Sequence, residues 1–586
     1  MPIKNSTYTQ KVDYLPDFFD VDDGAREVPV NMTLTAEGFL QKDYGIDDFL
    51  SSFTFPDEPT WVKNFKRKDG TQYLLVASGT KVYNVNLTKL KAYPIPSAIT
   101  AKTGTVAVIV GTVGVIGSGT AFTTEFAVGQ TIVIGTETCT IATITDDLNL
   151  TVDAGVTTAT GGGLSISLNA DKTFTAGGYF GSVEYNNDLY FGNAVDDYCK
   201  FDGSVVTAYG SLPKGNIFEV FEDRVFVSGV TAEPLSIYYS DVATPTTFNG
   251  ASVLKPLGTD KITGAVNYYG SLVILKLNSL WKMTFVYDQV ASAFLPKLEL
   301  LNRNYGCVGF RAYTWVENDI WFFTGVEMRA IGFKDQQAGI LGLDPAVISN
   351  DIKETLKNIT ASEASKIVLF YNDRKVFLCI PLSTVNDTVF VSHLLYKRAW
   401  CKIKGRKKSY VRSIDVRDDV VYFASSNEDK LYRWNSEWVD IAEAISAYVN
   451  FKEYQDKDFS QTNIWRYIDI KFKNLQSRVQ FNIWTDNFDL RTNINKTSYI
   501  GTDAEGQENS LGEVPFGENL VADAFGEDVT STNFVKRRIS LLQKGTAIAF
   551  GLANSTAEES FTICAFEITA MRKPRRYYSS SKIISI

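Results

Sequence analysis

YTWVENDIWFFTGVEMRAIG, residues 313–332, is the stretch that decides the fold. Apolar and polar side chains alternate on both sides of Glu317-Asn318-Asp319, which is the periodicity of two strands joined by a tight polar turn. A second turn at Thr324-Gly325 leads into a third short run that ends at Gly332. The stretch therefore predicts three consecutive strands joined by short turns.

The same unit recurs along the chain. Its turns are expected at Asn187-Asp188, Glu222-Asp223, Tyr269-Gly270, Asn372-Asp373 and Asp418-Asp419, with a weaker copy at Asp69-Gly70. From residue 188 onward, successive turns lie about 35 to 54 residues apart, a spacing typical of β-propeller blades. The repeat predicts a propeller of about six to eight blades, and the alternative is a large antiparallel sandwich.

The interval from residue 70 to residue 188 is too long for one blade. It contains residues 101–168, which are rich in Gly, Thr, Val, Ile and Ala and nearly devoid of Lys and Arg. Short alternating runs such as QTIVIG are separated there by Gly, Asp or Asn, which indicates a small all-β module inserted into a blade loop. Low complexity alone would suggest disorder, but the Val/Ile alternation argues against it.

These patterns divide an all-β chain into four parts. Residues 1–100 are an N-terminal arm with the first propeller strands, 101–170 the inserted module, 171–440 the blades, and 441–586 a C-terminal β-sandwich-like domain. The last part contains a long Gly-rich acidic loop, 503–528, without a basic residue. Only residues 349–365 look helical, with Ile352, Leu356 and Ile359 on the apolar side.

Composition narrows the classes of function. The chain has 586 residues, with 58 basic against 67 acidic side chains, a net charge of −9 that does not describe a protein that coats nucleic acid. The N-terminus has no apolar signal-peptide region, and no run is long enough to span a bilayer. Six cysteines without CxxC spacing indicate structural thiols.

The residues needed for common catalytic sites are scarce. The single histidine, His393, lies in an apolar run and is interpreted as a packed residue, so nucleophile–histidine and histidine–metal sites are not expected. Walker, dinucleotide and G-x-S-x-G motifs are missing from the sequence. We therefore expect no enzymatic activity, no cofactor and no metal, although paired carboxylates of a glycan hydrolase remain an alternative.

Two basic clusters remain after this search. They are interpreted as candidate subunit contacts, against the alternative of solvated charge, and their members are Lys404, Arg406, Lys407, Lys408, Arg572, Lys573, Arg575 and Arg576.

Several phrases, in their order, resemble a known protein family. They are YYSDVATPTTFNG (238–250), SLVILKLNSLWKM (271–283), GCVGFRAYTWVENDIWFFTG (306–325), LLYKRAWCKI (394–403), VYFASSNEDKLYRW (421–434) and a VKRRISLL strand (535–542). In this order they resemble the tail nozzle, or packaged-DNA stabilisation, proteins of tailed phages, similar in role to tail tubular proteins. The module phrase GSGTAFTTEFAVGQTIVIG (117–135) looks like a β module of phage virion proteins.

The resemblance implies a structural virion protein, made in the host cytoplasm. It would form a ring, hexameric by the same resemblance, below the portal and the head-to-tail adaptor, retain packaged DNA and conduct it during ejection. Implied partners are further copies, the adaptor, tail fibres or receptor-binding proteins, and transiting double-stranded DNA. The alternatives are a fibre-docking or receptor-binding tail protein and a virion-associated glycan hydrolase.

A conduit should repel DNA weakly so that the duplex slides without sticking. The acidic loop 503–528 is the strongest local source of negative charge, so it is expected to face the channel. The candidate channel-facing residues are Glu513, Phe516, Glu518, Asp523, Phe525 and Glu527.

Overall fold

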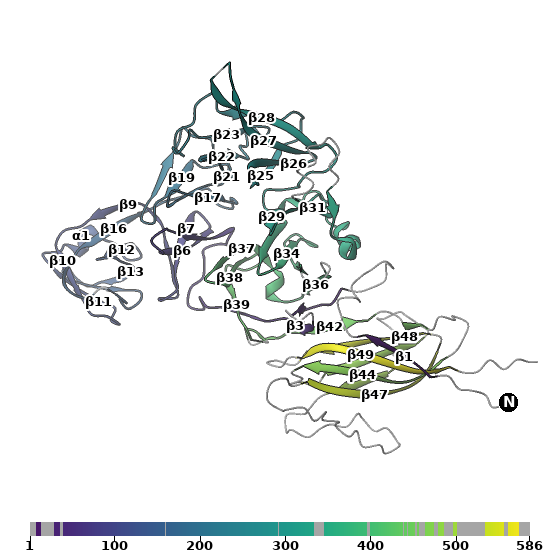
Figure 1. The fold of residues 1–586 in the computed structure, drawn as a ribbon. Coiled ribbons are helices and arrows are strands. Elements are labelled where there is room, and N and C mark those ends of the chain that lie inside the picture. Colours follow the sequence, from purple (N-terminus) through teal and green to yellow (C-terminus); the bar gives the residue numbers. More distant parts are fainter. Residues whose placement is uncertain are drawn as a thin grey trace, which may run out of the picture.

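The structure is a computed structural model that describes most of the chain. The described residues are 7–12, 28–35, 39–158, 160–290, 292–332, 345–394, 399–437, 439–441, 443–451, 454–455, 463–473, 479–485, 496–500, 534–545, 547–555 and 561–572. Within them the chain forms a β-propeller, a β module on one side of it and a two-sheet β-sandwich on another (Figure 1). The predicted fold class is confirmed.

Seven blades make up the propeller in the described residues: six are four-stranded antiparallel sheets and the seventh is a six-stranded sheet. Blade 1 is β5 (Trp61–Lys66), β6 (Gln72–Ser78), β7 (Lys81–Asn86) and β8 (Lys91–Pro94). Blades 2 and 3 are β17 (Gly181–Tyr185), β18 (Asp188–Gly192), β19 (Tyr198–Phe201) and β20 (Val206–Tyr209), then β21 (Ile217–Phe221), β22 (Arg224–Ser228), β23 (Ile237–Tyr239) and β24 (Val253–Leu254). Blades 4 and 5 are β25 (Ile262–Tyr268), β26 (Ser271–Lys276), β27 (Leu280–Asp288) and β28 (Ala293–Asn302), then β29 (Tyr313–Val316), β30 (Asp319–Phe323), β31 (Met328–Gly332) and β32 (Ala346–Val347).

The ring closes through a strand from the start of the chain. Blade 6 is β33 (Val368–Asn372), β34 (Lys375–Ile380), β35 (Thr388–His393) and β36 (Ala399–Lys404). Blade 7 is β37 (Val411–Arg417), β38 (Val420–Ser425), β39 (Leu431–Trp434) and, as its fourth strand, β4 (Ile46–Asp47), followed by β40 (Val439–Asp440) and β41 (Glu443–Ala444). Two bonds to β37 join blade 7 to blade 1: Val62 N donates to Ser413 Oγ at 3.0 Å and Asn64 N to Asp415 Oδ2 at 2.9 Å. First strands of most successive blades contact one another, so they line the propeller axis.

The stretch that opened the sequence analysis forms three strands of blade 5, as predicted. Ile320, Trp321, Phe322 and Phe323 are buried in β30. Tyr313 at the start of β29 packs on Gly264 of blade 4, where an added Cβ would lie 2.3 Å from the tyrosine ring. Glycine at 264 therefore lets the two blades approach closely.

The predicted hairpin turns exist, but two are displaced by one residue. The two displaced turns lie at 186–187 and 373–374. The turns at 222–223, 269–270 and 418–419 lie where they were predicted. Both central residues of each of these turns have positive φ, from 45° to 74°, as a type I′ turn requires. Asn, Asp and Gly tolerate that conformation best, which is why the turns could be found from the sequence.

The inserted module forms one continuous set of strands with its own core. Its strands are β9 (Pro96–Ala101), β10 (Thr105–Val108), β11 (Gly114–Ser118), β12 (Thr131–Ile134), β13 (Glu137–Ile144), β14 (Asn149–Val152), β15 (Gly161–Leu164) and β16 (Ile166–Asp171), with the short helix α1 (Phe122–Glu125). They pair in the order β15-β10-β11-β14-β13-β12-β16-β9. Phe122, Ile132, Ile134 and Cys139 are among the buried residues of this core.

The C-terminal sandwich has two sheets and takes strands from both ends of the chain. One sheet is β2 (Met32–Leu34), β3 (Leu40–Lys42), β49 (Thr562–Arg572), β44 (Asn463–Lys473) and β47 (Phe534–Gly545), with β1 (Thr7–Val12) also on β49. The other is β42 (Ala447–Asn450), β48 (Ala547–Asn554), β45 (Val479–Thr485) and β46 (Lys496–Ile500), with β43 (Tyr454–Gln455) on β48. The described strands before residue 48 therefore pair with the sandwich (β1, β2 and β3) and with blade 7 (β4).

The helix predicted over 349–365 is wrong in extent. The segment forms η2 (Asn350–Ile352), which continues directly into α3 (Lys353–Leu356), and then η3 (Ala364–Lys366) after intervening turns. Ile352, Leu356 and Ile359 are nevertheless buried, because the apolar spacing fits single helical turns equally well. A further short helix is η4 (Lys407–Ser409). Of the helices described, none has the length and apolarity to cross a membrane.

Candidate functional site

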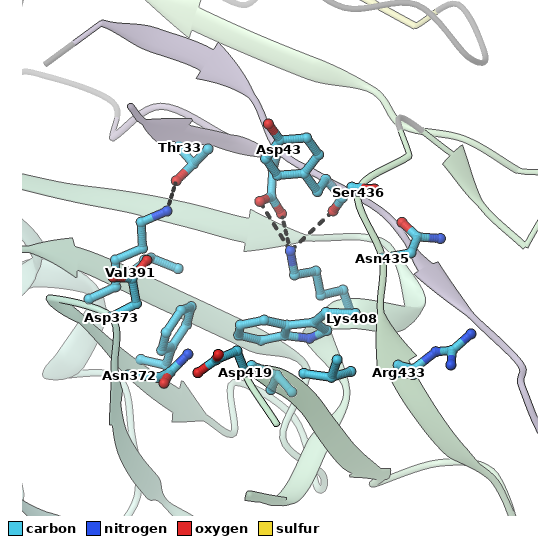
Figure 2. A pocket seen from close by; sticks show the side chains of 16 residues that line it. Thr33, Asp43, Asn372, Asp373, Val391, Lys408, Asp419, Arg433, Asn435 and Ser436 are labelled. Atoms are coloured by element: carbon cyan, nitrogen blue, oxygen red, sulfur yellow. Dashed lines mark hydrogen bonds and ion pairs between the residues drawn. The ribbon is translucent and has the colours of Figure 1, made fainter. Parts of the chain in front are cut away.

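One cavity of the described residues lies where the N-terminal residues meet blades 6 and 7. Its volume is about 510 Å³, and it is lined by blade turns, by the second and third strands of blades 6 and 7 and by residues from the start of the chain (Figure 2). The lining residues are Thr33, Asp43, Tyr44, Asn372, Asp373, Lys375, Phe377, Val391, Lys408, Asp419, Val420, Val421, Arg433, Trp434, Asn435 and Ser436. We call it the junction pocket, and residues 28–35 and 39–47 the junction segment.

Local geometry explains how charged side chains reach the junction pocket. Asp373 and Asp419 each have positive φ and lie in the turn between the first two strands of blades 6 and 7. Their side chains line the rim of the junction pocket. Lys375 and Phe377 are two residues apart on β34 and therefore share one face of the strand. Lys375 Nζ reaches across to Thr33 Oγ1 of the junction segment at 3.4 Å (Figure 2).

A buried ion cluster forms one wall of the pocket. Asp43 Oδ2 lies 2.9 Å from Lys408 Nζ and 3.0 Å from Arg406 Nη1. Arg406 also pairs with Asp440, with Nε 2.6 Å from Oδ2 and Nη2 2.7 Å from Oδ1. Arg406 and Lys408 both donate to the backbone oxygen of Tyr44. Two acids and two bases are thus matched one to one inside the protein.

Electrostatics favour the charged form of Asp43, whereas burial lowers the pKa of its partner Lys408. Burial alone would raise the pKa of Asp43, but Lys408 and Arg406 outweigh burial and hold the pKa below its usual range. Because each charge has a partner at bonding distance, the cluster is stable as a set and costly to break singly.

Trp434 provides the apolar side of the pocket. Its ring lies 4.7 Å from the ring of Phe377, and Lys408 Nζ lies 4.6 Å above it. The lysine therefore contacts an aromatic face and a carboxylate together, which fixes its direction.

The junction segment is fastened on both sides of the pocket. Asn31, at φ 54°, donates through Nδ2 to the backbone oxygens of Lys404 at 3.1 Å and Ser446 at 2.7 Å. Lys42 is fully buried and donates to Asn554 Oδ1 of the sandwich at 2.8 Å. The arrangement therefore joins propeller and sandwich, and its chemistry is that of a structural joint with a polar cavity beside it.

A second charged group lies on the propeller axis. Lys63 on β5 is 3.3 Å from Glu184 on β17 and 3.5 Å from Asp415 on β37. At the other end of the first strands, Arg311 donates through Nη1 to the backbone oxygen of Arg412 at 2.7 Å and lies 3.8 Å from the ring centroid of Tyr179. Side chains of blades 1, 2, 5 and 7 thus meet around the axis.

Glu219, on the first strand of blade 3, has a carboxyl group with a raised pKa. Burial raises the pKa of its carboxyl to about 7, although a backbone bond from Val220 opposes the shift. Such a carboxyl is protonated for much of the time near neutral pH, which is a property shared with general acids.

The structure corrects part of the predicted subunit contact. Arg406 and Lys408 are 7% and 4% exposed, because both side chains are paired inside the buried ion cluster. Their assignment to a subunit surface is therefore wrong. Lys407 is half-buried and pairs with Glu428 at 2.9 Å, while Lys404 is exposed. Arg572 ends β49, but its side chain, and Lys573, Arg575 and Arg576 entirely, lie outside the described residues.

The predicted channel residues cannot be placed. Loop 503–528, with Glu513, Phe516, Glu518, Asp523, Phe525 and Glu527, lies outside the described residues. Sequence reasoning did not find Asp43 or Asp440, since each is an ordinary acid beside a turn and its partners lie far away in the chain. No local spacing of residues could reveal these two acids either, because the fold alone brings them to their partners.

His393 and the cysteines are packed residues. His393 is 6% exposed on β35, and burial, with Lys375 and Arg374 nearby, lowers its pKa to about 4. All six cysteines are buried, and Cys307 lies in a loop between β28 and β29. Within the described part of the chain, three or more potential metal-ligating residues do not gather at any point.

Strand pairing and closure define the chain as a β-propeller protein. Neither a protein-family model nor a curated protein matches the sequence. Among solved structures, it is similar to the Pan2 WD40 domain of Neurospora crassa, with 10% identity and a TM-score of 0.29 over 69% of this chain and 97% of that one. It is also similar to the AfRom2 CNH domain, with 8% identity and a TM-score of 0.26 over 47% and 90%. These weak likenesses say nothing of function.

Proposed function

We propose that the chain is a structural subunit of a phage tail, a nozzle subunit that retains packaged DNA and conducts it during ejection. The ordered phrases of the sequence support this through their resemblance to tail nozzle proteins. The structural observation that carries the proposal is the joint: one N-terminal segment supplies strands to the sandwich (β2, β3) and closes the propeller (β4). Two units sharing one segment cannot separate without breaking strand pairs, which suits a part under mechanical load.

The charged propeller axis bears on where DNA would pass. Lys63, Glu184, Asp415 and Arg311 occupy the axis and are bound to neighbouring blades. A duplex therefore does not run through a single propeller, and it would pass along the axis of a ring of copies, expected to be six by the resemblance. The subunit would reside in the virion and contact the head-to-tail adaptor and fibres.

Imaging of the particles that carry the chain tests this proposal. A tag inserted at exposed Leu257 should label the tail, with several copies around its axis and next to the adaptor. Label at the distal ends of fibres would favour the fibre-docking alternative, and a single copy on the axis would exclude a ring.

The glycan hydrolase alternative has one residue to test, Glu219, because its raised pKa is that of a general acid. We expect the purified chain to release no sugar from host polysaccharide. Release that disappears in Glu219→Gln would favour the hydrolase over the nozzle.

A further inference from the structure

Blade 4 ends in a ribbon that extends beyond the blade. β26 pairs with β27 only from Leu280 to Met283, whereas β28 stays paired with β27 out to Asp288 and Ala293. Residues 284–290 and 292–297 thus form a two-stranded projection, which we call the finger (Figure 1, β27 and β28). Short isolated ribbons are marginal in water, so this length needs an explanation.

Both faces of the finger are apolar and exposed. Val286 stands opposite Leu295, and Tyr287 opposite Phe294, and adjacent pairs point to opposite faces of a ribbon. These side chains are 43% to 66% exposed, and Val290 at the tip is 98% exposed. Between residues 284 and 296 the one charged residue is Asp288. Monomeric proteins seldom expose such a cluster unless it binds something.

The finger also has free strand edges. β28 is the outermost strand of its sheet, and beyond Met283 β27 is no longer paired with β26. Among the described residues, these edges pair with no other strand. Unpaired backbone donors and acceptors beside apolar side chains are the features of a ribbon that binds by adding a strand.

A matching surface lies on the module of the same chain. We call it the module patch, and its members are Ile109, Val110, Val113, Ile116 and Leu148, which are 46% to 68% exposed. Beside it, β15 is the edge strand of the module sheet, and its Gly161 stands opposite Val108, next to the patch. Gly161, Gly162 and Gly163 are exposed, so another backbone can approach this edge closely.

We infer that the finger of one copy docks on the module patch and the β15 edge of the next copy. Residues 101–170 contain one basic residue, Lys102, and the finger tip has Asp288 alone, so neither surface must desolvate many charges. A lipid surface fits less well, since the tip offers an acid and no base to anionic headgroups. The inference rests on the proposed ring and names its contact.

Two different surfaces that bind head to tail close a ring when the rotation allows it. The finger exposes on the order of 500 Å² of side chain, less than the roughly 800 Å² per partner of a stable pair. A single contact is therefore weak, and ring closure adds the second contact that each copy needs. The finger and the patch act as the two sides of one interface.

Cross-linking of two full-length variants tests the contact. Phe294→Cys on the finger and Ile109→Cys on the patch place one exposed thiol each, and all native cysteines are buried. A short bis-maleimide should join the two variants when they are mixed at high concentration, at least tenfold more than either variant alone. Leu257→Cys, at a residue 78% exposed outside both surfaces, replaces Phe294→Cys as the matched control and should give only background.

Three results would overturn the inference: Phe294→Cys linking to itself as strongly as to the patch, the control linking equally, or no linkage above background. Flotation of the protein with phosphatidylglycerol vesicles, abolished by Phe294→Asp, would assign the finger to membranes. Melting curves of the variants should match the parent, since every substituted side chain is exposed. Tail label without linkage would leave the nozzle proposal standing, and linkage without tail label would leave the contact standing.

Discussion

The module and the sandwich are both β units attached to one propeller, but they are attached in different ways. The module keeps all its strands to itself and touches blade 1 through ion pairs, Lys89 with Glu137 at 2.7 Å and Lys91 with Asp153 at 2.8 Å. The sandwich shares the junction segment with blade 7 and is locked by the Asp43 cluster. The module is therefore an accessory with its own core, and the sandwich is part of the propeller's closure.

Breaking the joint should have the largest effect. Asp43→Ala leaves Lys408 buried without a carboxylate, and loss of one partner from a buried pair costs about 3–5 kcal/mol. We expect propeller and sandwich to lose stability together, as one calorimetric transition at lower temperature. Denaturant unfolding of the variant and the parent measures the difference.

Asp48→Ala is the matched control for this change. Asp48 pairs with Lys430 at 2.8 Å, but both side chains are partly exposed, so its loss should cost less than about 1 kcal/mol. An equal effect of the two substitutions would mean that the cluster at Asp43 does not fasten the joint.

Breaking the module's attachment should have a smaller and more local effect. Glu137 is buried against Lys89, and its carboxylate accepts backbone bonds from Thr157 at 2.7 Å and Thr158 at 2.9 Å. Glu137→Ala should therefore cost the module about 3 kcal/mol and make it melt first, in a transition of its own. Calorimetry of the full chain shows whether the main transition stays in place.

Glu125, which is only partly buried, offers a comparison inside the same module. It bonds only to Thr103 among the described contacts, so Glu125→Ala should shift the first transition far less. A single cooperative transition that moves as a whole in Glu137→Ala would show that the module belongs to the propeller core.

The hairpins could be predicted because their causes are local. Alternation along β29 and β30 and turn residues that accept positive φ are visible within about ten residues of sequence. The long spacing between turns at 70 and 188 likewise revealed the insertion. The length of the helix at 349–365 could not be predicted from local sequence. Short helical turns and one long helix would bury Ile352 and Leu356 equally well.

The joint could not be predicted because its partners are distant in the chain. Arg406 and Lys408 read as a surface cluster, since nothing near them in sequence neutralises their charge. Their partner Asp43 lies 363 and 365 residues away, and only ring closure by β4 brings it there. Runs of like charge are therefore weak guides to surface position when a terminal strand returns to the fold.

Mild acid should titrate two buried groups of the propeller, His393 and Glu219, with an effect smaller than that of either substitution. The chain's one histidine, His393, is on blade 6, and its folded pKa of about 4 lies below its ordinary 6.5. Its contribution to stability is therefore present above pH 6.5 and lost as the pH falls toward 4. Glu219 has the opposite sign: its folded pKa of about 7 lies above 4.5, so stability is gained as the pH falls from 7 to 4.5.

Between pH 7.5 and pH 5 the two groups should each contribute about 2 kcal/mol, in opposite directions, and nearly cancel in the parent. Substituting one group should uncover the other. His393→Gln should become more stable on acidification and Glu219→Gln less stable, by about 2 kcal/mol each in denaturant unfolding at the two pH values. The double variant should be flat, because neither titrating group remains. If the free energy of unfolding changes equally with pH in the parent and in both single variants, neither side chain titrates in this window. That result would contradict the predicted effect of acid on the propeller.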